Sequence, residues 1–196
     1  MSIKSITTLA DTKYLKLYNA EYTNKNGKSR NWSIASRKDL DTLNNTYFNG
    51  TEDRIDAVII VAKLVNNATP EDKLVVIKQF RVPLNDYVYE IPAGLIDADE
   101  DFETTVRREL KEETGLDLLE IDYNKTKPKA YISTGMTDES VALVYCTCIG
   151  QVSTDYLEPD EDIEVMLLSR QEAKILIGSD EKIDIKAFLA IVNFIG

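Results

Sequence analysis

Short runs of apolar and β-branched residues alternate along the chain with polar, turn-forming segments, a pattern typical of β-strands. Strands are predicted from Ala57, from Lys73 and from Tyr87, and at residues 129–133, 141–149 and 163–168. Residues 66–72, which separate the first two runs, have the composition of a turn. The pattern therefore predicts a sheet of closely spaced strands.

The N-terminal part of the chain has the signature of a β-hairpin. Two strand-like stretches, 14–22 and 29–38, flank Asn26-Gly27, a dipeptide that adopts the positive φ angles a tight turn needs. The next segment, 39–53, is rich in Asn, Thr and Asp and predicts a loop. We therefore expect a boundary there, with an N-terminal β-hairpin element at 1–50 and the main domain at 51–196.

Three segments have helical patterns. The strongest spans 101–114, where Asp101 is suited to be the N-cap residue and Gly115 follows as a left-handed C-cap. Two further helices are predicted at 170–177 and 184–194. Because strands and helices do not alternate regularly, the sequence predicts an α+β fold, an α/β/α sandwich with a mixed β-sheet between helices.

The charge of the chain limits its partners. Its 196 residues include 34 acidic and 23 basic side chains, a formal net charge of -11, which argues against binding to nucleic acid or to anionic membranes. No apolar stretch approaches the roughly 20 residues that span a bilayer. A phosphate-bearing ligand would have to be met locally by metal ions and a few Arg or Lys side chains, and we expect a cytoplasmic protein.

The absence of histidine restricts the possible chemistry. It excludes Ser-His-Asp triads, Cys-His dyads and His-ligated zinc, so carboxylates become the expected catalytic groups. Cys146 and Cys148 lie one residue apart in a predicted strand, where alternation places both on one buried face. Two such thiols form neither a disulfide framework nor a good metal site.

The predicted helix at 101–114 gathers carboxylates on one face. Glu109, Glu112 and Glu113 fall within about a turn of one another, whereas the opposite flank is apolar and can bury against a sheet. Because like charges repel, the arrangement favours divalent cations between them. Oxygen-only ligands select Mg²⁺, with Mn²⁺ as a second candidate, and such ions support pyrophosphate-bond hydrolysis by a bound water.

The spacing of these residues resembles the Nudix box. Gly94, Glu100 and the run from Arg108 to Leu116 occupy every fixed position of that motif within GLIDADEDFETTVRRELKEETGL. Ordinary residue frequencies make a chance match on the order of one in a million or less. The chain is therefore similar to the Nudix hydrolases.

This resemblance implies two kinds of role for the box residues. Carboxylates, commonly with a backbone carbonyl, hold the metal, and the matching positions here are Glu109, Glu112, Glu113 and Ala93. A charged pair, Glu100 and Arg108, supports the loop-helix-loop, and Gly94 gives the backbone room to turn into it.

The segment before the box is similar to the ADP-ribose pyrophosphatase branch of the family. VVIKQFRVPLNDYVYEIPAGLID carries the Gln-aromatic-Arg and Glu-apolar-Pro-Ala-Gly pattern of that branch. The resemblance implies that Arg81 contacts a substrate phosphate, a role that suits a guanidinium fork, although a surface Arg at a strand end is the alternative. Glu90 is expected to be structural rather than catalytic.

The N-terminal hairpin also resembles this branch, whose members exchange a β element between two subunits to hold the adenine. NGKSRNWSIASR is similar to that segment. We therefore expect a homodimer in which Trp32 stacks on the base, Tyr14 supplies the second face and Arg37 makes a polar contact. Alternatively, Trp32 packs beneath a dimer hairpin.

The loop after the box departs from the branch at one position. Thr134 stands where members of the branch usually have the proline of Ser-Pro-Gly, which weakens the substrate assignment and leaves the metal chemistry untouched. The base that takes a proton from the attacking water is expected on a loop, with Glu139 as the first candidate and Glu161 as the second. Either carboxylate can instead be a solvated loop charge.

The resemblance predicts a Mg²⁺-dependent hydrolase that uses a metal-activated water to split the pyrophosphate bond of ADP-ribose, or of a related nucleoside-diphosphate sugar. The products from ADP-ribose are AMP and ribose 5-phosphate. Two alternatives stay open: a Nudix hydrolase of another nucleoside diphosphate derivative, such as a dinucleotide or sugar nucleotide, and a sensor that binds ADP-ribose without cleaving it. The intact box glutamates favour an enzyme over a sensor.

Overall fold

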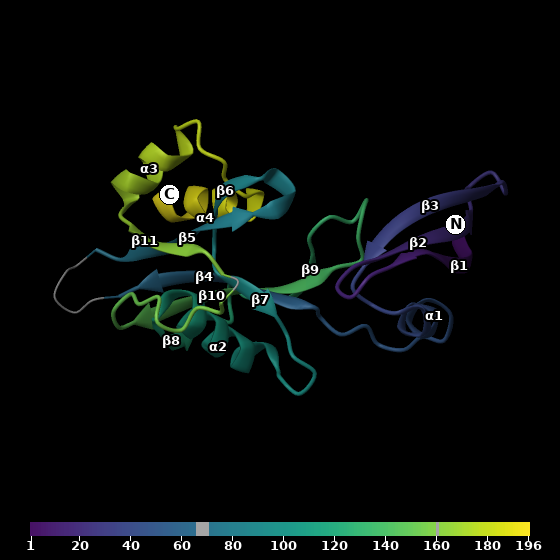
Figure 1. The fold of residues 1–196 in the computed structure, drawn as a ribbon, viewed down its shortest axis with the longest axis horizontal. Helices are drawn as coiled ribbons and strands as arrows, with labels where there is room; N and C mark the ends of the chain where they lie inside the picture. Colours follow the sequence, from purple (N-terminus) through teal and green to yellow (C-terminus); the bar gives the residue numbers. More distant parts are fainter. Residues whose placement is uncertain (66–70, 160) are drawn as a thin grey trace. The chain divides into compact units, whose positions relative to one another are not determined.

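The computed structural model describes residues 1–65, 71–159 and 161–196. It contains two compact units, one formed by residues 1–56 and 129–141 and the other by residues 57–128 and 142–196 (Figure 1). The turn predicted at 66–72 falls mostly on residues 66–70, outside the described part of the chain. The predicted division into 1–50 and 51–196 stays a prediction.

The first unit contains an antiparallel sheet with the strand order β1 (Ser2–Asp11), β2 (Lys16–Thr23), β3 (Ser29–Ser36). The predicted hairpin is β2–β3, and Gly27 takes a φ of 77° in its turn. β1 was not predicted because its side chains are largely exposed, and only Ile6 is buried within it.

A helix, α1 (Leu40–Phe48), occupies most of the segment 39–53 in which the composition predicts a loop, so that prediction was wrong for residues 40–48. Asp39 caps the helix by accepting a hydrogen bond from the Thr42 backbone N–H at 2.7 Å. Leu43 is fully buried and packs with Ile6 and Tyr18 in the core of this unit. Tertiary packing of one apolar side of the helix therefore outweighs the loop-like composition.

The second unit is built on a larger sheet, whose main strand order is β11-β5-β4-β10-β8. β6 pairs with β5, β7 with β4, and β9 with β10. The bounds are β4 (Ala57–Leu64), β5 (Lys73–Arg81), β6 (Asp86–Glu90), β7 (Ala93–Leu95), β8 (Asp117–Ile121), β9 (Lys127–Tyr131), β10 (Ser140–Ile149) and β11 (Ile163–Leu168), with a 3₁₀ turn at Val82–Leu84. β9 and β10 each contribute residues to both units.

The larger sheet is mixed, as predicted. β4 runs antiparallel to β5, with Lys63 opposite Leu74. It runs parallel to β10, because the Asp56 N–H donates to the Ser140 carbonyl at 2.8 Å and the Val65 N–H donates to the Cys148 carbonyl at 3.0 Å. The hydrogen bonds at the two ends thus advance in the same direction along both strands.

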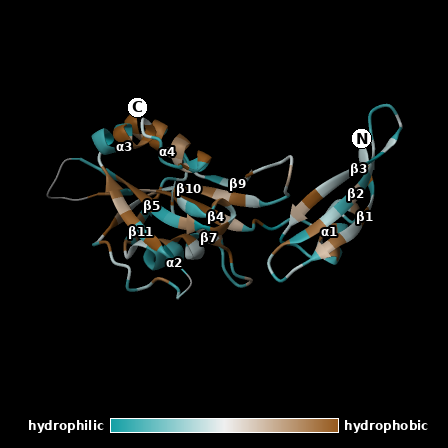
Figure 2. Ribbon diagram, turned by 45° about the horizontal axis from the view of Figure 1, so that its top comes forward, coloured by the Kyte–Doolittle hydropathy of each residue, from teal (hydrophilic) through white to brown (hydrophobic). Residues whose placement is uncertain are grey.

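Helices cover the two faces of this sheet. α2 (Phe102–Thr114) packs on β4 and β7 on one side, and α4 (Ile185–Ile195) packs on β5 and β6 on the other, next to α3 (Arg170–Ile177) (Figure 1). Figure 2 shows apolar residues concentrated in the strands between them. The predicted α+β fold with a mixed sheet between helices is confirmed.

The structure also bears on the two cysteines and on membrane-spanning helices. Cys146 and Cys148 are both buried in β10 and neither forms a disulfide. Burial raises the pKa of each thiol to about 12, which makes both poor metal ligands. Within residues 1–65, 71–159 and 161–196, no helix is long and apolar enough to cross a membrane.

Candidate functional site

Helix α2 carries the predicted carboxylates and is fixed at both ends. The Asp101 carboxylate accepts a hydrogen bond from the Thr104 N–H at 2.8 Å, and Gly115, with a φ of 74°, donates its N–H to the Lys111 carbonyl. Val106 and Leu110 are fully buried against the sheet. These contacts set the rotation of the helix and hence the direction of its carboxylate-bearing face.

Glu109 and Glu113 are buried on that face. Only 9% of Glu109 and 3% of Glu113 is exposed. Glu113 Oε2 accepts a hydrogen bond from the Ala93 N–H at 3.1 Å, which joins the helix to β7. The structure thus brings Ala93 and two of the three box glutamates together.

Gly94 makes room for a carboxylate. A Cβ added to it would lie 1.9 Å from both Cδ and Oε1 of Glu109, closer than any real contact. Gly94 sits in β7 and is not among the residues with positive φ. The residue is therefore explained by the close approach of Glu109 rather than by the backbone turn that we expected.

The buried carboxylates destabilise each other's charged forms. Burial raises the pKa of Glu113 well above its usual value, and the charges of Glu109 and Glu161 add to the effect. Burial likewise raises the pKa of Glu109, with contributions from Glu112 and Glu161. A cation placed among these groups would favour their ionised forms.

Arg108 is a cation that contacts Glu109 and Glu112. Its Nη1 lies 2.7 Å from Glu109 Oε1 and 3.0 Å from Glu112 Oε2. Its Nε and Nη2 each donate to Glu100 at 3.0 Å, and Nη2 also donates to the Leu95 carbonyl at 3.1 Å. Arg108 therefore links the loop before α2 to two of the three carboxylates.

The carboxylates suit a hard divalent ion in chemistry, because they offer oxygen atoms only. In the described part of the chain, no group of three or more carboxylate or thiol side chains is arranged as a ready metal site. Arg108 instead contacts both Glu109 and Glu112. Binding of a metal by all three glutamates would require Arg108 to release two of them while keeping Glu100.

Arg81 and Glu90 form a bidentate pair beside the carboxylates. Arg81 Nε donates to Glu90 Oε1 at 2.6 Å and Nη2 donates to Oε2 at 2.8 Å. The hydrogen bond to Glu90 raises the pKa of Arg81, and the nearby charge of Glu113 contributes. Glu90 is buried, so its visible role is to orient Arg81. The other N–H groups of the guanidinium can serve further acceptors.

Glu161 belongs to the same unit as the box. Its Oε2 accepts a hydrogen bond from the Glu158 N–H at 3.0 Å. It is close enough for its charge to raise the pKa of both Glu109 and Glu113.

In the first unit, Trp32 borders a cavity of about 300 Å³. Its indole Nε1 donates to the Gly135 carbonyl at 3.2 Å. The cavity is also lined by Ile34, Tyr47, Tyr131 and residues 134–138, which include Thr134. Sequence reasoning missed Tyr47 and Tyr131, because the first lies in the segment assigned to a loop and the second in a strand with no distinctive motif.

Tyr14 lies away from Trp32. The register of β2 and β3 places Trp32 opposite Ala20 and Ser36 opposite Lys16. Tyr14 precedes Lys16, so it is more than about 13 Å from Trp32 along the strands. One chain therefore does not bring the two rings to opposite faces of a base, and such a pair would need a second copy.

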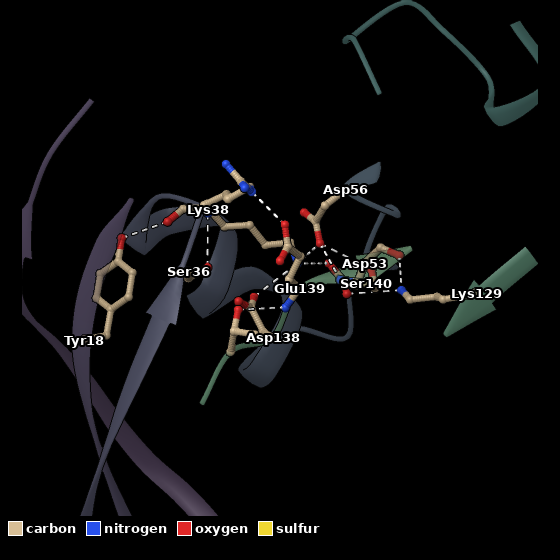
Figure 3. Close-up of polar contacts among 11 residues, drawn as sticks. Tyr18, Ser36, Lys38, Asp53, Asp56, Lys129, Asp138, Glu139 and Ser140 are labelled. Carbon is tan, nitrogen blue, oxygen red and sulfur yellow. Dashed lines mark hydrogen bonds and ion pairs between the residues drawn. The ribbon is translucent and has the colours of Figure 1, made fainter. Parts of the chain in front are cut away.

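Arg37 and Glu139 contact each other. Arg37 Nε lies 2.8 Å from Glu139 Oε1. The neighbouring Lys38 contacts Asp138 (Figure 3). The predicted polar contact and the first candidate base are thus paired in the first unit.

Comparison with known families and proteins agrees with this geometry. The sequence model described as NUDIX domain matches residues 53–188. An ADP-ribose pyrophosphatase of Saccharomyces cerevisiae is 33% identical over 141 residues, covering 72% of this chain and 55% of that protein. An ADP-ribose pyrophosphatase of Bacillus subtilis is 38% identical over 125 residues, covering 63% and 65%. The chain thus spans between half and two thirds of these relatives.

A solved structure has the same fold. The crystal structure of an ADP compounds hydrolase superposes with a TM-score of 0.71 over 97% of this chain and 90% of the other, at 17% sequence identity. At that identity the likeness concerns the fold alone.

Proposed function

Because the chain belongs to the NUDIX domain family, we propose that it hydrolyses the pyrophosphate bond of ADP-ribose or of a related nucleoside-diphosphate sugar. The products from ADP-ribose would be AMP and ribose 5-phosphate. The observation that carries the proposal is the burial of Glu109 and Glu113 side by side on one face of α2, because two buried carboxylates favour a cation between them. The match to two ADP-ribose pyrophosphatases supports the substrate class.

We assign the cofactor as Mg²⁺, with Mn²⁺ as a substitute, held by Glu109, Glu112, Glu113 and the Ala93 carbonyl. When bound, the ion would offset the charge of the pyrophosphate and acidify a water molecule. Mg²⁺ fits the donors because all of them are oxygen atoms. In this proposal Arg108 keeps Glu100 and Leu95 while it gives up the two carboxylates.

The residues of the chain then have distinct tasks. Arg81, oriented by Glu90, donates N–H groups to a phosphate of the substrate. A loop carboxylate takes the proton of the attacking water, whose oxygen forms a bond to one phosphorus while the bond from that phosphorus to the bridging oxygen breaks. The influence of Glu161 on Glu109 and Glu113 supports Glu161 ahead of Glu139 for this task.

We assign the base of the substrate to the cavity beside Trp32. Its volume of about 300 Å³ and its three aromatic side chains, Trp32, Tyr47 and Tyr131, suit a purine ring. Arg37 would contact the ligand after leaving Glu139. The homodimer, the role of Tyr14 as the second face for the base and the cytoplasmic location stay predictions.

The test measures turnover and binding together. Purified protein is incubated with ADP-ribose and Mg²⁺, and AMP is quantified by chromatography, with EDTA as the metal-free control. We expect AMP only with Mg²⁺, and near-complete loss of turnover in Glu113→Gln with an unchanged circular dichroism spectrum. Binding of ADP-ribose without turnover would identify a sensor.

A substrate panel separates the enzyme alternatives. ADP-ribose, ADP-glucose, NADH and diadenosine polyphosphates are compared by kcat/KM under the same conditions. We expect ADP-ribose or an ADP-sugar to be preferred. A higher kcat/KM for a dinucleotide would replace the proposed substrate with that class.

A further inference from the structure

Lys38 is enclosed by three aspartates in the first unit (Figure 3). Its Nζ lies 2.9 Å from Asp53 Oδ1, 3.1 Å from Asp138 Oδ2 and 3.5 Å from Asp56 Oδ2. Only 10% of the Lys38 side chain and 13% of the Asp138 side chain is exposed. The cluster is therefore a nearly buried ion network.

The network is internally connected. Asp53 also accepts from Lys129 Nζ at 3.1 Å, and Asp56 Oδ2 accepts from the Ser140 N–H at 2.8 Å. Burial opposes the charge of Lys38, but the hydrogen bond to Asp53 and the charges of Asp138 and Asp56 outweigh it and raise the pKa of the lysine. Removing one partner from such a network leaves an uncompensated buried charge, which is strongly unfavourable.

The cluster contacts the residues immediately before and after Glu139, Asp138 and Ser140. Asp138 contacts Lys38 directly, and Ser140 reaches it through Asp56. Within the loop of residues 133–139, residues 134–138 line the cavity beside Trp32, and the Gly135 carbonyl accepts the hydrogen bond from the Trp32 indole. Lys38 thus connects the end of β3 to one wall of that cavity.

The neighbouring ion pair, Arg37–Glu139, is more exposed to solvent than the Lys38–Asp138 contact. Arg37 and Glu139 are 41% and 22% exposed, so their ion pair is screened by solvent and readily exchanged. The buried contact between Lys38 and Asp138 is the one that resists exchange. Lys38 therefore holds Asp138 in place, whereas its neighbour Arg37 can exchange Glu139 for another partner.

We propose that Lys38 is a positioning residue, which through Asp138 fixes the loop of residues 133–139 as a wall of the Trp32 cavity and thereby sets the affinity for the nucleotide. The affinity part rests on the proposed function, because it needs the base to bind in that cavity. The fixing of the loop does not depend on turnover.

Trp32 provides the first measurement, since it is the only tryptophan of the chain and contacts the loop. We expect acrylamide quenching of its fluorescence to increase about twofold in Lys38→Met and in Asp138→Asn. Asp72→Asn is the matched control, because it removes an aspartate that contacts Lys63 at 3.3 Å where both side chains are about 40% exposed. Unchanged quenching in folded Lys38→Met and Asp138→Asn would overturn the proposal. If Lys38→Met does not fold, Asp138→Asn alone decides, because Lys38 retains Asp53 and Asp56.

The second measurement titrates AMP in EDTA by calorimetry, so that neither metal nor turnover is needed. We expect the dissociation constant to rise about five- to tenfold in Asp138→Asn and to stay unchanged in Asp72→Asn. Altered quenching with unaltered affinity would overturn the affinity part. If the wild-type protein does not bind AMP, the base site of the proposed function is wrong, and the quenching result still decides whether Lys38 fixes the loop.

Discussion

The carboxylate of Glu109 occupies the space that a side chain at Gly94 would fill. The 1.9 Å separation between the hypothetical Cβ and Glu109 Cδ shows that β7 and α2 approach closely at this point. The glycine thus fixes the location of a carboxylate that belongs to another element. A side chain at position 94 would therefore displace the Glu109 carboxylate.

Gly94→Ala should impair catalysis much more than stability. The added methyl group would displace the flexible end of the Glu109 side chain, so we expect kcat to fall about 100-fold, equivalent to roughly 2.7 kcal/mol, with a small change in Tm. Gly178→Ala is the control, because a Cβ there meets its nearest neighbour, the Lys174 carbonyl, at 3.5 Å. A Gly94→Ala protein with wild-type kcat would refute the explanation.

Arg108→Lys should lower both stability and activity. A lysine cannot reproduce the fork that serves Glu100, Leu95 and the carboxylates together. We expect a loss of about 1–3 kcal/mol in the free energy of unfolding and at least a tenfold decrease in kcat, measured by urea denaturation and AMP release. Arg107→Lys, on the same helix, should have a much smaller effect on both, because Arg107 makes a single long contact, 3.4 Å, with the Leu118 carbonyl; equal effects of the two substitutions would contradict the prediction.

Glu113→Gln should stabilise the metal-free protein at neutral pH. The folded-state pKa of Glu113 is raised, so its favourable contribution exists below the unfolded pKa of about 4.3 and is lost as pH rises through the folded value. In EDTA at pH 7.5 we therefore expect Tm to increase by about 2–4 °C, with a smaller gain near pH 4.5.

In Mg²⁺ the wild-type protein should be more stable than Glu113→Gln, the reverse of the order in EDTA. The wild-type protein binds the ion more tightly and is stabilised by that binding. Glu120→Gln, which changes an exposed glutamate of β8, controls for the loss of one charge. A Glu113→Gln protein that is less stable than the wild type in EDTA at pH 7.5 would argue that the buried charge of Glu113, next to Glu109, does not destabilise the metal-free fold.

The two candidate bases should differ in kinetics. Because Glu161 influences both buried carboxylates, we expect Glu161→Gln to lower kcat at least 100-fold with little change in KM. Glu139→Gln, which only frees Arg37, should lower kcat less than tenfold. Steady-state kinetics with ADP-ribose distinguishes them, and a larger loss in Glu139→Gln would restore that residue as the first candidate.

Much of the fold was predictable from local signals. α2 begins after Asp101 and ends before Gly115, as capping chemistry dictates, and β11 and α3 match their predicted ranges. α1 was missed because its helical state depends on burial of Leu43 against Ile6 and Tyr18, which are distant in the sequence. β8 was missed because it is short and follows α2 directly.

The site was predictable where it depends on spacing within one helix. The shared face of the box glutamates follows from helical periodicity. The contact between Arg108 and Glu109, the filling of the Gly94 space and the separation of Trp32 from Tyr14 depend on side-chain rotamers and strand register. A sequence pattern does not contain that information.

The first unit is discontinuous in sequence, since residues 1–56 are completed by residues 129–141. Lys38 and Asp138 are 100 residues apart. During synthesis, the N-terminal sheet therefore emerges from the ribosome long before its buried lysine can meet the last of its partners. A nascent chain or a proteolytic fragment that ends before residue 138 contains all three strands of the N-terminal sheet but lacks the partner of Lys38 at Asp138, so the buried ion network is completed only after residue 138 has been synthesised.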